Sequence, residues 1–251
     1  MPADALMAPD GCPKAASRGD HETDIMDILF FFKTRTDFIR RFYEEASLVF
    51  TDRMSKIEDG KPPYADTDDL LDESAKPPYQ AEWGHAKDSL EVLGLTCVSM
   101  LAASLHAYFL AWEAEFGVKW EKEKHEREKL FKQKGLAGYV NELERLLKLP
   151  CGNCPAKLEL LEQVILARNA AQHADKITDL IPEHRKSDLE KHPRPFFMTE
   201  GESTLLEGDL ADISFLVPRV RISQGQLRHV VDEAESLAIW LDTHLHSRWG
   251  R

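Results

Sequence analysis

Long segments with the apolar spacing of α-helices alternate along the chain with short segments rich in proline and glycine. Apolar residues recur at three- and four-residue steps in each long segment. This spacing predicts helices over residues 24–56, 81–116, 136–149, 155–175 and 224–247. Thr23 and Ser223 are the expected N-caps of the first and last of these helices. The pattern predicts an all-α fold, an antiparallel bundle of long helices.

The segments between the predicted helices lack helical spacing. Residues 59–80 contain two Pro-Pro-Tyr sequences and are expected to form a rigid surface connection, although such proline segments also dock into aromatic grooves. Thr204–Leu206 and Ile213–Val217 are short apolar runs that predict extended pieces, and Pro218 limits the second to an edge or an end. We therefore expect a short irregular or hairpin insert before the last helix.

The composition fits one folded domain with a tail. The chain has 251 residues, 43% of them hydrophobic, which is enough for a substantial core. Residues 1–22 are rich in alanine, proline, glycine and aspartate without periodicity and are expected to be a disordered tail. No good boundary divides the rest, so residues 23–251 are expected to form a single helical domain.

The second predicted helix carries no charge between Val92 and Trp112. Such a stretch is long enough to cross a bilayer. However, Thr96, Ser99 and Ser104 dilute it, and no lysine or arginine lies beside either end to set an orientation. We interpret it as the central helix of a bundle, not as a membrane span. His106 within it is expected to be a hydrogen-bonded core histidine, and contact with the 155–175 helix stays open.

The strongest candidate for chemistry lies near the end of the predicted 155–175 helix. Arg168, Asn169 and His173 follow an apolar run there. Asn169 and His173 are one turn apart on the same face, whereas Arg168 is about 140° round the axis from His173. A fixed cation, an amide and an imidazole suit a phosphodiester, because arginine binds anionic oxygens and histidine moves protons. The alternative is a polar last turn whose cations lie near the helix carbonyls.

The sequence Arg168-Asn169-x-x-x-His173, late in a long helix of a helical chain, resembles the HEPN superfamily, which is marked by arginine, four to six residues and then histidine. The preceding long helices and the following irregular segment and amphipathic helix extend the resemblance over roughly Asp24 to Trp249. The short motif carries most of its specificity.

This resemblance implies a metal-independent endoribonuclease that cleaves RNA by attack of a ribose 2′-hydroxyl on the adjacent phosphate, with no cofactor. Arg168 would stabilise the transition state, His173 would act as base or acid, and Asn169 would orient His173 or contact the phosphate. The resemblance also implies a homodimer and a role in toxin–antitoxin or antiviral defence, with an antitoxin or regulatory protein as a further partner. The alternative is a non-catalytic HEPN-like dimerisation or adaptor protein.

Charge argues against a broad RNA-binding surface, because the formal net charge is −12. The segment from Lys119 to Lys134, however, contains seven basic residues and only four glutamates. This segment is more typical of a self-paired exposed helix face, yet it contains the best candidates for RNA-backbone contacts. These candidates are Lys122, Lys124, Arg127, Lys129 and Lys132.

Cysteines give no evidence of a disulfide framework or of a metal centre. Four cysteines are too few for a disulfide scaffold at this length. Cys151 and Cys154 have the spacing of half a zinc site or of a redox pair, but no second pair completes a metal site. Packing cysteines are the favoured interpretation, and a redox switch is the alternative. No secretory signal pattern is visible, so a cytoplasmic protein is expected.

Overall fold

Seven helices account for most of the described chain. The computed structural model describes residues 27–65, 79–115, 117–118, 125–148, 154–173, 179–207 and 217–249. The helices are α1 (Ile28–Glu58), α2 (Gln80–Glu115), α3 (His125–Leu147), α4 (Leu158–Gln172), α5 (Lys186–Lys191), α6 (Glu200–Glu207) and α7 (Gln224–Trp249). Within these ranges the only β-structure is an isolated bridge between Glu183 and Arg219. The predicted all-α class is confirmed.

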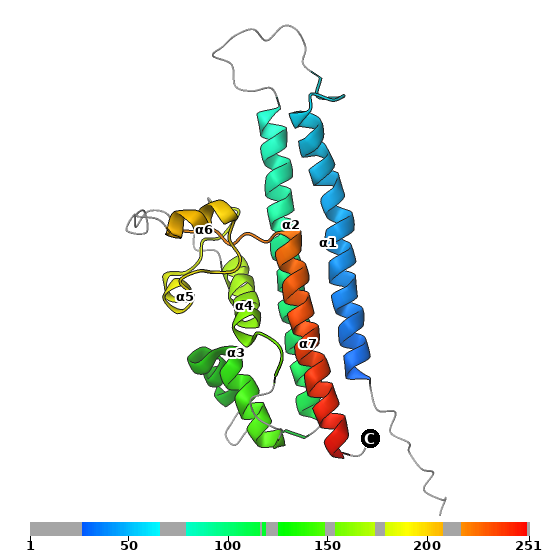
Figure 1. Cartoon of the computed structure of the whole chain (residues 1–251), viewed down its shortest axis with the longest axis vertical. Coiled ribbons are helices and arrows are strands. Elements are labelled where there is room, and N and C mark those ends of the chain that lie inside the picture. The colour runs from blue at the N-terminus through cyan, green and yellow to red at the C-terminus, as the bar shows by residue number, and fades with distance from the viewer. Residues whose placement is uncertain are drawn as a thin grey trace, which may run out of the picture.

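α2 lies at the centre of the helix arrangement. It packs against α1 on one side, α4 on the other and α7 on a third, and α3 packs against α4 (Figure 1). Cys97, Val98 and Leu101 of α2 are fully buried. By length and composition α2 is able to cross a membrane, but 61% of its most apolar window is buried inside the structure. This burial is typical of a core helix, as the sequence interpretation expected.

Polar contacts hold α7 against α1 and α2. The buried Thr36 hydroxyl of α1 donates to Glu235 Oε1 of α7 at 2.6 Å, and Arg40 pairs with Asp232 at 2.6 Å. From α2, the buried Tyr108 hydroxyl donates to the Ala238 carbonyl at 2.9 Å. Burial of a polar group is tolerated when it is hydrogen-bonded, so these contacts fix the three helices relative to one another.

Side-chain caps define where several helices begin. Asp27 accepts a hydrogen bond from the Phe30 amide at 2.7 Å, so α1 begins at Ile28. The predicted start at residue 24 is therefore wrong, and its expected cap Thr23 lies outside the described residues, as does the predicted 1–22 tail. Ser223 and Gln226 exchange hydrogen bonds at the start of α7, which confirms the predicted cap there.

The predicted extended piece at Thr204–Leu206 is wrong, because these residues lie in helix α6. Thr199 and Glu202 form a capping box: the Glu202 carboxylate accepts from the Thr199 amide at 2.9 Å, and the Thr199 hydroxyl accepts from the Glu202 amide at 3.2 Å. The capping box therefore stabilises a helix where the short apolar run alone predicted an extended piece. Residues 213–216 of the second predicted piece lie outside the described residues, and Val217 and Pro218 are not in a strand.

The predicted 136–149 helix starts earlier than expected. α3 begins at His125 and bends at Gly135, whose φ of 66° lies in the left-handed region that glycine adopts without strain. A Cβ at this position would overlap the Glu162 carboxylate of α4. The glycine therefore permits both the bend and the close approach of α3 to α4.

The segment before α7 is fastened by backbone hydrogen bonds around Phe197. The buried Phe197 offers its carbonyl to His184 Nε2 at 2.9 Å and to the Arg221 amide at 3.1 Å. The Arg221 guanidinium then reaches Glu91 of α2 at 2.7 Å. These contacts attach the insert to the central helix.

The close approach of the insert to α2 predicts opposite effects for two glycines of that helix. A Cβ on Gly94 would lie 2.8 Å from the Ile222 carbonyl oxygen, whereas a Cβ on Gly84 would meet nothing within 4 Å. Alanine favours a helix over glycine by about 0.5–1 kcal/mol, so Gly84→Ala should stabilise the protein by that amount. Gly94→Ala should instead destabilise it by about 1–3 kcal/mol, because backbone must shift. Urea unfolding followed by circular dichroism measures both, and a stabilising Gly94→Ala would contradict the packing.

A second prediction concerns His184. Burial lowers its pKa below the usual 6.5, and the bond to the Phe197 carbonyl offsets this only in part. Because the unfolded state then binds the proton more tightly, the free energy of unfolding should be highest above pH 6.5 and fall as the pH drops below that value. His184→Gln keeps a donor but does not titrate. Urea unfolding at pH 7.5 and 5.5 should show a smaller loss for this variant, and equal losses would refute the assignment.

Candidate functional site

α4 carries the predicted site but is shorter than predicted. It begins at Leu158 with Lys157 as its N-cap residue and ends at Gln172, so the predicted range 155–175 is wrong at both ends. His173 is the C-cap residue, and its amide donates to the Asn169 carbonyl at 3.1 Å. Leu161 and Val164 are fully buried. This apolar face fixes which way the polar end of the helix points.

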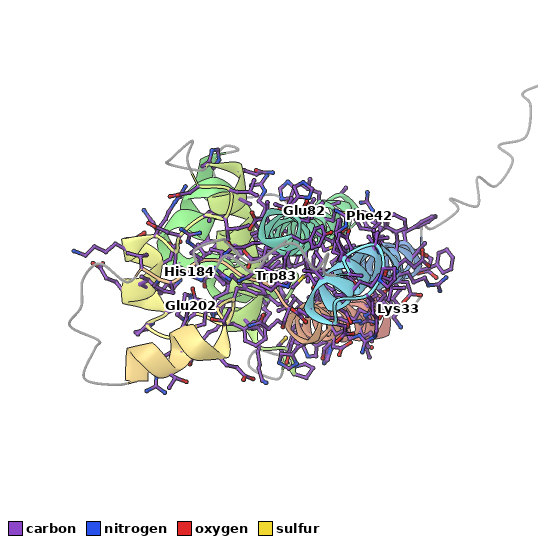
Figure 2. The ribbon with its side chains drawn as sticks, turned by 90° about the horizontal axis from the view of Figure 1, so that it is seen from above. Lys33, Phe42, Glu82, Trp83, His184 and Glu202 are labelled. Atoms are coloured by element: carbon purple, nitrogen blue, oxygen red, sulfur yellow. The ribbon has the colours of Figure 1, made fainter. Side chains whose placement is uncertain are left out.

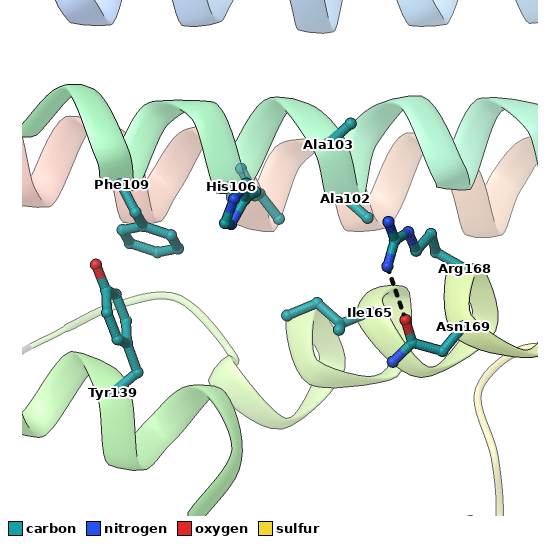
Figure 3. Close-up of a pocket in the computed structure, with 9 residues that line it drawn as sticks. Ala102, Ala103, His106, Phe109, Tyr139, Ile165, Arg168 and Asn169 are labelled. Atoms are coloured by element: carbon teal, nitrogen blue, oxygen red, sulfur yellow. Dashed lines mark hydrogen bonds between the residues drawn. The ribbon is translucent and has the colours of Figure 1, made fainter. Parts of the chain in front are cut away.

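A pocket of about 370 Å³ lies between α2, α3 and α4 (Figure 3). Its polar lining residues are Arg168, Asn169 and His106, and Tyr139 comes from α3. The remaining lining residues are Ala102, Ala103, Leu105, Phe109 and Ile165. Small side chains on α2 face the Arg168 side, and the two aromatic rings lie at the other end. The space is therefore polar at one end and apolar at the other.

Among the described residues, no carboxylate pairs with the Arg168 guanidinium. Its Nη1 donates to Asn169 Oδ1 at 3.0 Å, and within the described ranges it forms no ion pair. Both side chains are half-buried. A partly buried guanidinium bonded to one neutral amide keeps further N–H donors available, so this end of the pocket suits an anion.

His173 does not line this pocket. It is exposed, and its carbonyl accepts a long 3.5 Å bond from Arg185 Nη2. The structure therefore brings Arg168 and Asn169 together and places His173 one turn beyond Asn169, at the end of α4. An exposed imidazole can approach a large ligand that extends out of the pocket, but it is not enclosed with the guanidinium.

His106 lines the pocket together with Arg168 and Asn169 of α4, in agreement with the contact to the 155–175 helix that the sequence left open. The expectation of a core histidine is wrong, because His106 is exposed and lines the pocket. The sequence held no signal for this exposure, because Thr96, Ala103 and Leu110, which are also exposed at seven-residue steps on that side of α2, carry no charge. In Figure 3 the imidazole lies about one turn along α2 from Ala102, toward Phe109.

The cysteine at the start of α4 is not activated. Burial raises the pKa of Cys154 above its usual value, and burial raises that of Cys97 to about 12. The thiolate is the reactive form, so neither environment favours redox chemistry. Cys151 lies outside the described residues. Among the residues that are described, no three His, Cys, Asp or Glu side chains gather in a group that could hold a metal ion.

The candidate RNA contacts lie in and before α3. Lys122 and Lys124 are outside the described residues. Arg127, Lys129 and Lys132 lie in the first part of α3, ahead of the bend at Gly135. Their role in RNA binding stays a prediction.

Comparisons of the chain with protein-family models, with curated proteins and with solved structures find no match. The resemblance to the HEPN superfamily therefore stays a prediction based on the motif and the helical frame.

Proposed function

We propose that this chain is a HEPN-type, metal-independent endoribonuclease. The observation that carries the proposal is the half-buried Arg168, which is bonded to Asn169 and unpaired with any carboxylate in the described structure, at one end of a pocket. A guanidinium in this setting suits a phosphate, since it offers parallel N–H donors in a partly desolvated site. A phosphodiester is also a ligand large enough to reach beyond the pocket.

In the proposed reaction the ribose 2′-oxygen attacks the adjacent phosphorus. The new P–O bond closes a 2′,3′-cyclic phosphate, and the bond to the 5′-oxygen breaks. A base accepts the 2′-hydroxyl proton and an acid donates a proton to the leaving oxygen. Arg168 stabilises the added negative charge of the transition state, and Asn169 holds the guanidinium in place.

Proton transfer is assigned first to His173, which follows Asn169 by one turn. The other transfer needs a second group. The histidine of a second subunit would supply it in a homodimer, as the resemblance implies. His106 is the alternative within the same chain, because it lines the pocket together with Arg168.

The biological setting that we propose is toxin–antitoxin or antiviral defence, with RNA as substrate and a regulatory protein as a further partner. The runner-up function is that of a non-catalytic dimerisation or adaptor protein. The exposed apolar side chains of α1, among them Phe38 and Val49, favour that alternative because they give the chain an association surface.

The proposal predicts loss of RNA cleavage in two variants. Arg168→Ala removes the charge that stabilises the transition state, and His173→Ala removes a proton-transfer group. Each should lower the cleavage rate by at least about 10²-fold. Purified protein is incubated with total RNA in EDTA, and the new ends are analysed for 2′,3′-cyclic phosphate. His106→Ala in the same assay tests whether this imidazole supplies the second transfer.

His85→Ala is the matched control, because His85 is an exposed histidine of α2 that does not line the pocket. It should cleave at the wild-type rate. Equal cleavage by wild type and both Arg168→Ala and His173→Ala would reject the catalytic assignment. A wild-type protein that never cleaves RNA would leave the adaptor function as the better account.

A further inference from the structure

α1 presents a row of apolar side chains to solvent on a face that no described helix covers. Its core face is formed by Ile28, Phe32, Ile39 and Tyr43, all buried. On the outer face the exposed fractions are 53% for Phe31, 56% for Phe38, 37% for Phe42 and 60% for Val49. Figure 2 shows Phe42 on the side of α1 turned away from α7. Isolated exposed apolar residues are ordinary, but an aligned row indicates a contact surface.

The row has the spacing of a coiled-coil seam. Two charged residues, Arg35 and Glu45, fall in register with the four apolar residues. The six positions, separated by four and three residues in alternation, are Phe31, Arg35, Phe38, Phe42, Glu45 and Val49. This alternation is that of the a and d positions that pack one helix along another. We name these six residues the α1 row.

The two charged side chains of the α1 row have no oppositely charged partner within the described chain. Arg35 and Glu45 are exposed and take part in no ion pair there, whereas the nearby Arg40 and Arg41 pair with Asp232 and Asp37. A charged residue at a seam position costs stability unless it meets an opposite charge. The α1 row therefore calls for a partner with a complementary pattern.

The α1 row is complementary to itself when it is reversed. Around residue 40 as the centre, each member of the row has a counterpart at the same distance on the other side. The resulting pairs are Phe31 with Val49, Arg35 with Glu45, and Phe38 with Phe42. We propose that two copies of this chain associate through antiparallel α1 helices, with the two-fold axis crossing the α1 row midway between Phe38 and Phe42. The interface is then isologous, and each of these pairs occurs twice.

Charge selects this arrangement over its alternatives. A parallel, in-register pair would set Arg35 against Arg35 and Glu45 against Glu45, whereas the antiparallel pair sets opposite charges together. The α1 row itself has no net charge, which matters because two chains of net charge −12 repel each other elsewhere. At the axis, Phe38 and Phe42 are stacked, with ring centroids 5.9 Å apart and 8° between the planes. They form a flat apolar centre for the contact.

Charge exchange tests the pairing in the full chain. Sedimentation velocity over a concentration series should show a dimer for the wild type. Arg35→Glu places two glutamates together and Glu45→Arg two arginines, so each should raise the dimer dissociation constant at least about tenfold. The double variant should restore the wild-type dimer. An equimolar mixture of the two single variants should form a heterodimer, because each supplies the charge that the other lacks.

Two further variants distinguish association through the α1 row from non-specific association through other exposed apolar residues. Phe38→Asp should abolish the dimer, and Leu48→Asp should leave it intact, since Leu48 is 65% exposed but lies about 100° from the row. A wild type that is monomeric at about 100 µM, a concentration well above the micromolar affinities of ordinary interfaces, overturns the proposal. A dimer that ignores the single charge reversals, or that the double variant fails to restore, overturns it too. Because α1 and α4 lie on different sides of α2, this dimer does not bring the two α4 ends together, and His106 of the same chain is then the group for the second proton transfer. None of these results depends on RNA cleavage, so failure here leaves the nuclease proposal standing with His106 in that role.

Discussion

Burial of α2 is the constraint on which the arrangement depends. Its uncharged stretch from Val92 to Trp112 cannot be left in water, and α1, α4 and α7 each cover part of it. Its hydroxyls do not oppose this burial, because Ser99 and Ser104 bond to carbonyls one turn back at 2.8 Å. The packing of α4 against α2 then decides where Arg168 lies. The position of the candidate site is thus a consequence of how α4 packs against α2 in the core.

The pocket exists because the α2–α4 contact is uneven. Val164 and Ala167 of α4 are buried, whereas Arg168 and Asn169, the next residues along, line a pocket whose α2 side includes the small Ala102 and Ala103. A guanidinium cannot enter the dry core without a large desolvation penalty. It lies instead beside the small residues, held by one amide bond. Arg168 therefore prevents close packing of α4 against α2 at this point, and its guanidinium stays accessible to a ligand.

The sequence predicted where the long helices lie, but it did not predict which side of α2 is exposed. Apolar spacing located the five long helices, because burying one side of a helix leaves a periodic record. That record is missing from α2 between Val92 and Trp112, where even the exposed positions are uncharged, so His106 could not be assigned to the surface. In α6, the Thr199–Glu202 cap decided the structure, and a short apolar run gave no sign of it.

The acidity of the chain bears on how such a site would select its ligand. A surface of net charge −12 repels a polyanion at long range, so RNA would gain little from non-specific attraction. Affinity would then come from the few groups at short range, with Arg168, which pairs with no carboxylate among the described residues, as the cation of the pocket. Because salt screens long-range repulsion as well as attraction, binding at this site would depend less on ionic strength than binding to a basic surface does. An acidic protein with Arg168 in a pocket favours recognition of one accessible phosphodiester over non-specific binding along RNA.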